Sequence, residues 1–353
     1  MEVPILKILL PATIAFAIGI LLTPLLTHQL YRHRAWKKAS GKTALGGSEA
    51  SEFNRLKGAA ETKTPRMGGI IIWASVLLTV ALLTAAAQLA PESLLGSLTF
   101  MSRAQTWIPL TALGVGAAIG FLNDFYDIRV GGRGLRLSVR LALVSVLAAG
   151  IGWWFYDKLD VVAIGVPFAE PVVIGVLIIP FFILLTNAIY ASGVIDGIDG
   201  LSGGVFAAIF AAYSGVALVQ NQFDIAALCA TITGATLAFL WFNIPPARFW
   251  MTETGSMSLT LTLAVVVFMT DDLGDGHGIA LLPIIGVPLV ATVGSNVLQL
   301  LYRKATGGKK LLRIAPLHHH FEAIGWPSYK VTMRYWVISM ICAILGVMIA
   351  AVA

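Results

Sequence analysis

The stretch GGVFAAIFAA, Gly203–Ala212, contains no polar side chain. It lies in an apolar segment, 200–218, that is long enough to cross about 30 Å of hydrocarbon as a helix. A second stretch, ALGVGAAIG at 112–120, has the same mixture of small and aliphatic residues, which allows close helix packing. Over the whole 353-residue chain, 58% of residues are hydrophobic, 12% are charged and the mean hydropathy is +0.85. The sequence therefore predicts an integral membrane protein.

Ten segments are long and apolar enough to span a membrane. They are 4–29, 68–90, 107–125, 135–156, 171–190, 200–218, 225–243, 256–271, 278–302 and 333–352. Helices are expected, because a lipid-facing backbone must satisfy its own hydrogen bonds and the alternation of barrel strands is absent. Both cysteines, Cys229 and Cys342, fall inside spans and indicate no disulfide framework. We expect one all-α, polytopic transmembrane domain over 1–353.

The distribution of Lys and Arg predicts the orientation. Nine lie between the first two spans, three follow the third, and six lie between the last two, whereas the alternate loops hold only Arg103 and Lys158. Short basic loops stay in the cytoplasm, so both termini are expected on the extracytoplasmic side. The net charge of +6 is then mainly a topology signal, and no nucleic-acid partner is expected.

Four polar segments fall on the predicted cytoplasmic side. GFLNDFYD (120–127) closes the third span, TNAIYASGVIDGIDGLSGG (186–204) joins the fifth to the sixth, WFNIPPARFWMTETGS (241–256) joins the seventh to the eighth, and APLHHHFE (315–322) precedes the tenth. We expect these cytoplasmic loops to form one active site at the inner membrane surface. The extracytoplasmic DDLGDGH (271–277) is interpreted as a solvated turn.

The residue types in these segments suggest phosphate chemistry. Carboxylates from different loops suit Mg²⁺, which is typically held by one or two of them and completed by water and phosphate oxygens. Basic residues nearby would neutralise phosphate. An anionic substrate, with a diphosphate as the expected form, is predicted, and the position at the headgroups allows one reactant to be a lipid.

Several motifs together carry a family resemblance. They are TPRMGGI (64–70), DGIDGL (196–201), WFNIPPARFWM (241–251), GSMSL (255–259) and GGKKLLRIAPLHHHFEAIGWP (307–327). On these motifs the chain resembles, essentially end to end, the phospho-N-acetylmuramoyl-pentapeptide transferases of the polyprenyl-phosphate N-acetylhexosamine-1-phosphate transferase superfamily. The APLHHHFE…GWP run points to this branch.

The resemblance implies transfer of phospho-N-acetylmuramoyl-pentapeptide from its UDP conjugate to undecaprenyl phosphate, with release of UMP and with Mg²⁺ as cofactor. It implies a bacterial inner-membrane enzyme of peptidoglycan synthesis, and hence of cell-wall biogenesis, cell shape and cell division, and it leaves room for a homodimer. The implied catalytic residues are Asp124, Asp199, Glu253, His318 and His319, with Asp124 and Glu253 as metal ligands. The implied substrate-binding residues are Lys63, Asn187, Asp196, Asn243, Trp250, Gln299 and His320.

Some positions depart from the family pattern. Its paired aspartate reads Asn123–Asp124 here, and the lysine three residues further on is Asp127, for which Arg129 is a candidate replacement. Glu253 stands for an aspartate, and Trp250 stands for a phenylalanine expected to stack on uracil. The 187–199 loop reads as though three residues were inserted, with a second asparagine lost.

An amide at Asn123 cannot act as a general base or a nucleophile. However, a phosphate monoester has a second pKa near 6, so the lipid phosphate is already largely dianionic at neutral pH. We therefore expect a single in-line attack by the lipid phosphate on the sugar-linked phosphorus.

Simpler explanations stand beside these assignments. Asp196 and Asp199 could cap the sixth helix, Asp124 and Glu253 could be solvated boundary residues, and Lys63 could be one more topology charge. Asp127 is interpreted as structural. Zinc is not favoured for the histidines, because adjacent helical residues point about 100° apart, and the glycine-rich 39–54 segment is interpreted as a connection. A catalytically impaired homologue that binds lipid carrier or nucleotide, and a transporter, remain the alternative functions.

Overall fold

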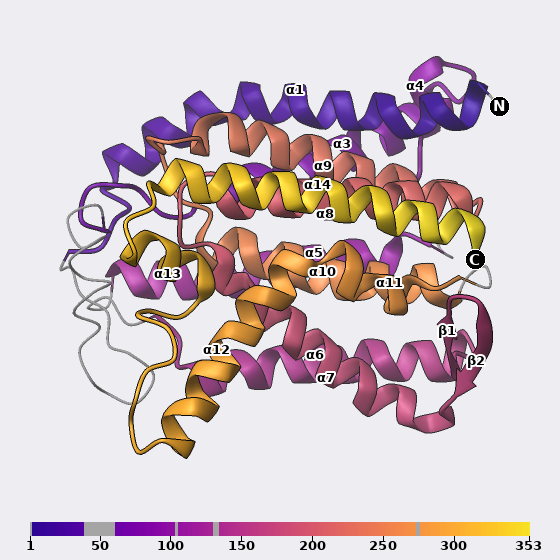
Figure 1. Ribbon diagram of the computed structural model, residues 1–353. Coiled ribbons are helices and arrows are strands. Elements are labelled where there is room, and N and C mark those ends of the chain that lie inside the picture. The colour runs from indigo at the N-terminus through magenta and orange to yellow at the C-terminus, as the bar shows by residue number, and fades with distance from the viewer. Residues whose placement is uncertain (1, 39–60, 103–104, 130–133, 273–275) are drawn as a thin grey trace.

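The computed structural model describes residues 2–38, 61–102, 105–129, 134–272 and 276–353. Long helices running roughly parallel dominate the molecule (Figure 1). They are α1 Glu2–Arg32, α3 Ile70–Leu89, α5 Trp107–Arg129, α6 Leu137–Lys158, α7 Ile178–Ser192, α8 Leu201–Val219, α9 Phe223–Asn243, α10 Thr252–Asp272, α12 Val287–Ala305 and α14 Ser328–Val352. The short elements are α4 Leu94–Ser97, α11 Gly278–Ile285, α13 Leu317–Ala323, the 3₁₀ turns Gly175–Leu177 and Gly193–Ile195, and the antiparallel strands β1 Ala163–Val166 and β2 Ala169–Val173.

The predicted class is confirmed. Within the described residues, nine helices are long and apolar enough to cross a membrane, and there are ten spans if the bent pair α11 and α12 is counted as one. The two termini lie at the same end of the bundle, as an even number of crossings requires (Figure 1). The β1–β2 hairpin lies at that end, and α13 lies at the opposite end.

Two predicted spans are wrong in detail. The span 171–190 begins too early, because its first residues belong to β2 and a 3₁₀ turn and α7 starts only at Ile178. The span 278–302 is two helices that meet at 75°. The break falls at Gly286, and Pro288 follows in the first turn of α12. Proline has no N–H to donate and disfavours a helical conformation in the residue before it. Figure 1 shows α12 leaving the bundle obliquely.

The turn at 271–277, predicted to be extracytoplasmic, also differs from expectation. Asp271 is buried and is not a solvated residue. Its carboxylate accepts backbone N–H groups from Gly165 (2.9 Å) and Ile279 (2.9 Å), which ties the hairpin and α11 to the end of α10. Asp271 therefore has a structural role. Residues 273–275 of this turn, like the 39–54 connection, lie outside the described residues.

Helix α10 forms the centre of the bundle. It packs along α5 and also contacts α7, α8 and α11. Gly116 and Gly120 of α5 make this approach possible, because a Cβ at Gly120 would overlap the carbonyl oxygen of Glu253. Backbone-to-backbone packing of this kind is typical of small residues at membrane helix interfaces. It fixes the end of α5 against the first turn of α10, and both carry candidate site residues.

Candidate active site

Asp124 is the most deeply buried acid of the site. It is fully inaccessible to solvent, so it is not a solvated boundary residue. One carboxylate oxygen, Oδ2, accepts the hydroxyl of Thr252 (2.5 Å) and both the hydroxyl (2.6 Å) and the N–H (2.9 Å) of Thr254. Hydrogen bonds to a charged acceptor are the strong kind. The start of α10 therefore holds Asp124 in one orientation.

Asn123 supports the same carboxylate from the other side. Its amide nitrogen donates to Oδ1 of Asp124 (3.3 Å), and its amide oxygen accepts the N–H of Leu135 (2.9 Å). An aspartate at this position could not make the first of these bonds. The amide thus has a definite structural use beside Asp124.

The aspartates of the IDGIDG loop converge on the segment that leads into α10. Asp196 accepts the Thr252 N–H (2.8 Å) and the Ser202 hydroxyl (2.7 Å). Asp199 accepts the indole N–H of Trp250 (3.1 Å) and the N–H of Ala247 (3.1 Å). Helix α8 begins instead after Gly200, which makes no side-chain cap hydrogen bond. The capping explanation is therefore wrong for both aspartates.

Asp196 has the clearest electrostatic perturbation outside the spanning helices. Burial raises its pKa above the ordinary value for an aspartate. The hydrogen bonds from Ser202 and Thr252 and the positive charge of Arg66 oppose that rise without cancelling it. Ionised Asp196 is therefore less favourable here than an exposed aspartate would be.

Glu253 lies in the first turn of α10 and forms an ion pair with Arg140 of α6. Both side chains are half-buried, with 25% and 20% of their surfaces exposed. Glu253 follows Thr252 in the chain, so its backbone belongs to the turn that holds Asp124 and Asp196. Three carboxylates from three segments thus meet around the first turn of α10.

Asp127 belongs to a basic cluster next to this acidic group. It lies 3.1 Å from Arg66 and 4.0 Å from Lys37, and Lys37 also pairs with Glu61 at 3.6 Å. This agrees with the structural interpretation of Asp127. The Arg129 guanidinium lies over the ring of Phe125 (5.3 Å), and its role as a replacement for the family lysine stays a prediction. Arg66 and Lys37 bring positive charge to the site.

The histidine run lies in α13 and faces the aspartate loop. His318 and His319 are buried, with ring centroids 4.4 Å apart. A Cβ on Gly197 would lie only 2.7 Å from Nε2 of His318 and 2.6 Å from Nε2 of His319. His319 Nδ1 lies 2.8 Å from a carboxylate oxygen of Glu322. His318 and His319 thus join the group around Asp196 and Asp199, whereas His320 accepts the backbone N–H of Arg313 (3.2 Å).

Four other predicted substrate-binding residues have different surroundings. Asn243 is buried and bridges the Gly200 N–H to the Phe249 carbonyl. Gln299 of α12 likewise binds backbone groups of Leu311 and Leu312. Asn187 donates to the Ser145 hydroxyl (3.0 Å) and to its own helix, and Lys63 is exposed. Asn243 and Gln299 shape the loops around the site, and for all four substrate binding stays a prediction.

The donor set is compatible with a hard divalent cation. In the described part of the chain, no three acidic, histidine or cysteine side chains are arranged to hold a metal by themselves. Mg²⁺ does not require such a cage, because one or two carboxylates suffice when water and phosphate supply the remaining oxygens. Asp124 and Glu253 provide two carboxylates, linked through Thr254, one residue after Glu253.

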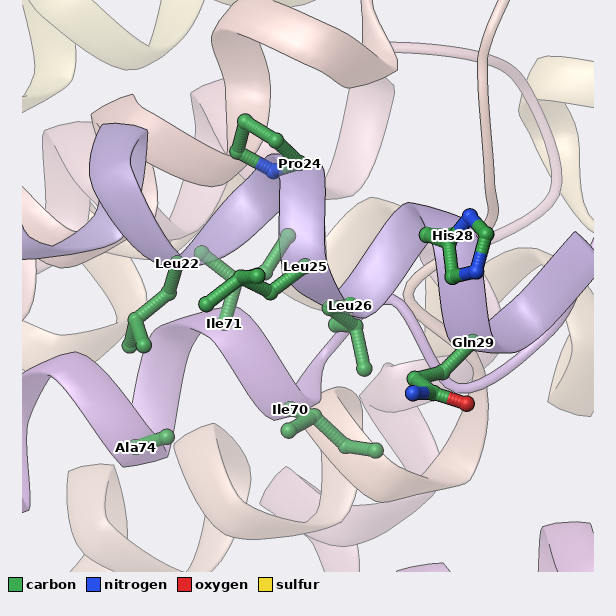
Figure 2. Close-up of a pocket in the computed structure, with 9 residues that line it drawn as sticks. All are labelled: Leu22, Pro24, Leu25, Leu26, His28, Gln29, Ile70, Ile71 and Ala74. Carbon is green, nitrogen blue, oxygen red and sulfur yellow. The ribbon is translucent and has the colours of Figure 1, made fainter.

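An apolar groove of about 560 Å³ lies outside this site, between α1 and α3. Figure 2 shows its walls of leucine and isoleucine, with His28 and Gln29 at one end. Pro24 lies inside α1 at this point, where its ring removes one helical hydrogen bond.

Four site residues were not singled out from the sequence. Thr252 and Thr254 lie within a quoted motif but carry no charge, and Arg66 was counted as a topology charge and quoted within TPRMGGI without a role of its own. Arg140 had the clearest signal, because it is an arginine inside a predicted span, where ionisable residues commonly serve function. It lies outside the four polar segments that suggested the site.

The fold and this polar site define a polytopic membrane transferase. Residues 106–271 match the model of glycosyl transferase family 4. The phospho-N-acetylmuramoyl-pentapeptide-transferase of Geobacillus sp. (strain WCH70) is 35% identical over 82% of this chain and 84% of the relative. The protein of that name from Listeria monocytogenes serotype 4b (strain CLIP80459) is 32% identical over 80% and 83%, and that of Bacillus anthracis (strain A0248) is 31% identical over 97% of both chains.

These similarities cover the site as well as the helices, because the matched region 106–271 includes Asp124, Asp196, Asp199 and Glu253. The chain belongs to the phospho-N-acetylmuramoyl-pentapeptide-transferase family.

Proposed function

We propose that this protein transfers phospho-N-acetylmuramoyl-pentapeptide from UDP to undecaprenyl phosphate and releases UMP. One observation carries the proposal: Asp124, Asp196 and Glu253, from three separate segments, meet at the first turn of α10 with Arg66 and Arg140 beside them. A diphosphate bond needs such a setting, in which phosphoryl oxygens meet cations and carboxylates hold the groups in place.

The reaction is a single in-line displacement. An oxygen of the lipid phosphate attacks the sugar-linked phosphorus, a new P–O bond forms, and the bond to the UMP phosphate breaks with the electron pair leaving on UMP. The attacking phosphate is already ionised at neutral pH, so Asn123 does not need to remove a proton. This agrees with the use of Asn123 as a donor to Asp124.

Trp250 and the histidines would position the nucleotide. The Trp250 indole is anchored by its N–H to Asp199, which leaves the ring face as a platform for uracil. His318 and His319 lie against Gly197 of the same loop, where imidazole N–H groups can meet phosphate oxygens.

Mg²⁺ is proposed as the cofactor, held by Asp124 and Glu253. When bound, it would neutralise phosphoryl oxygens and stabilise the leaving phosphate. The carboxylates come from helices that are in backbone contact at Gly120, so their separation is set by packing.

The proposed location is the bacterial inner membrane, with the site facing the cytoplasm. Among the described residues that border the basic loops predicted to be cytoplasmic, the last turns of α1 and α12 lie at the same end of the bundle as α13, opposite the two termini (Figure 1). Both termini would then be extracytoplasmic. Association as a homodimer remains part of the proposal and is to be measured on the purified protein.

UMP release tests the proposal. Purified protein in detergent is given UDP-N-acetylmuramoyl-pentapeptide, undecaprenyl phosphate and Mg²⁺, and UMP is measured by chromatography. We expect UMP that depends on both substrates, and its loss in Asp124→Ala. Nucleotide binding without UMP release in the wild-type protein would refute the transferase and favour a binding homologue. An Asn123→Asp variant that releases UMP when the wild type does not would identify Asn123 as the cause.

A further inference from the structure

The ion pair between Arg140 and Glu253 places a cation where the proposed metal would need a ligand. The guanidinium contacts Oε1 of Glu253, and both side chains are largely removed from solvent. The Nε of Arg140 is buried without an acceptor among the described residues. Glu253 therefore cannot give its carboxylate fully to a metal ion while Arg140 keeps this position.

The other basic groups of the site do not compete in this way. Arg66 is paired with Asp127, and Lys37 lies between Asp127 and Glu61. Asp124 is bound by hydroxyl and N–H groups, which are neutral donors. In the described part of the site, Arg140 is thus the positive group in ion-pair contact with one of the three converging acids.

We propose that Arg140 is an internal competitor for the metal site, which occupies Glu253 until a divalent cation displaces it. The inference rests on the proposed function, because it assumes that Glu253 is a metal ligand. Once displaced, the guanidinium lies next to the metal site and can donate two parallel N–H groups to a phosphate. Arg140 would then be a positioning residue that couples metal entry to diphosphate binding.

An ordinary structural salt bridge makes the opposite prediction for metal binding. If Arg140 merely held Glu253 in place, removal of Arg140 would disorder the Glu253 side chain and weaken metal binding. If Arg140 competes with the metal, its removal frees the Glu253 carboxylate and strengthens metal binding, because the metal no longer has to displace the guanidinium.

The test measures Mn²⁺ as a probe of the Mg²⁺ site, by electron paramagnetic resonance of the unbound ion, without nucleotide or lipid. Arg140→Gln is compared with wild type and with Arg136→Gln, a matched control on the exposed arginine at the N-cap of the same helix, four residues earlier. We expect Mn²⁺ to bind Arg140→Gln at least tenfold more tightly than wild type, and Arg136→Gln to match wild type. Unchanged or weaker binding in Arg140→Gln would overturn the proposal.

Two further variants keep the test decisive. Arg140→Lys retains a cation that pairs through a single point, so we expect an intermediate gain in affinity. If Arg140→Gln does not fold, no gain in Arg140→Lys overturns the proposal. In a Glu253→Gln background, Arg140→Gln should not change the affinity for Mn²⁺. An unchanged gain in affinity in that background would contradict competition at Glu253.

The inference and the proposed function can fail separately. If the wild-type protein releases UMP but Arg140→Gln binds Mn²⁺ no more tightly, the transferase function stands and the proposed role of Arg140 as a competitor is refuted. If Arg140→Gln binds Mn²⁺ more tightly but the wild-type protein releases no UMP, the role of Arg140 as a competitor stands and the transferase function is refuted.

Discussion

Thr254→Val tests whether the first turn of α10 holds Asp124 ready for the reaction. Valine keeps the shape of threonine and the backbone N–H, and it removes one of the three donors to Oδ2 of Asp124. A hydrogen bond to a charged group contributes about 1.5–3 kcal/mol, so about 2 kcal/mol should be lost. If catalysis depends on this orientation, that loss corresponds to roughly a 30-fold lower kcat/KM.

The assay is initial-rate UMP release, together with the Tm of the protein in detergent. Thr260→Val is the matched control, because Thr260 is also buried in α10 but, among the described residues, its hydroxyl donates to carbonyls of its own helix, at Ser256 (2.8 Å) and Met257 (3.3 Å). We expect a small change in kcat/KM there. Equal kcat/KM values for the two variants would refute the reasoning.

Three further predictions follow from the packing and the charges. Gly120→Ala should lower the Tm strongly, because its Cβ would overlap the α10 backbone. Gly114 has open space around it, so Gly114→Ala should change the Tm little, and equal effects of the two variants would contradict the packing argument. Burial raises the pKa of Asp196, so its ionised form costs folding free energy at pH 7 and less as pH falls towards about 4. Asp196→Asn should therefore raise the Tm at pH 7 by more than at pH 4. A rise in Tm that does not depend on pH would contradict the raised pKa of Asp196. Asp127→Lys places a third cation beside Arg66 and Lys37 and should lower the free energy of unfolding, measured with denaturant, by about 3 kcal/mol or more. Asp127→Asn should lower it less, and the reverse order would show that the cluster is not ion-paired.

The sequence predicted the helices well because the membrane imposes their length and composition. Eight of the ten predicted spans each correspond to one helix with modest boundary shifts. The ninth was misjudged because hydropathy is blind to direction: an apolar run bent by 75° at Gly286 has the same composition as a straight one. The β1–β2 hairpin was missed because the end of β2, residues 171–173, is apolar enough to extend the neighbouring span.

The acidic half of the site was also predictable, because Asp124, Asp196 and Glu253 are conspicuous in an apolar chain. Their partners were not. Whether Arg140 meets Glu253, or Arg66 meets Asp127, depends on how each helix is rotated about its axis, and that is set by packing such as the Gly120 contact. Threonines were invisible for a different reason: the same hydroxyl serves its own helix at Thr260 and a carboxylate at Thr254.

The central position of α10 has a consequence for biogenesis. Of the nine helices in the described part of the chain that could each span a membrane alone, α10 has the lowest hydropathy, and it is almost wholly enclosed by its neighbours. Alone in lipid it would expose a row of hydroxyls and an acidic first turn, so its partitioning from the translocon into the bilayer gains little free energy by itself. Because α5 through α9 are synthesised earlier, they can receive α10 as it emerges. Membrane integration of α10 should therefore depend on docking against helices already in place.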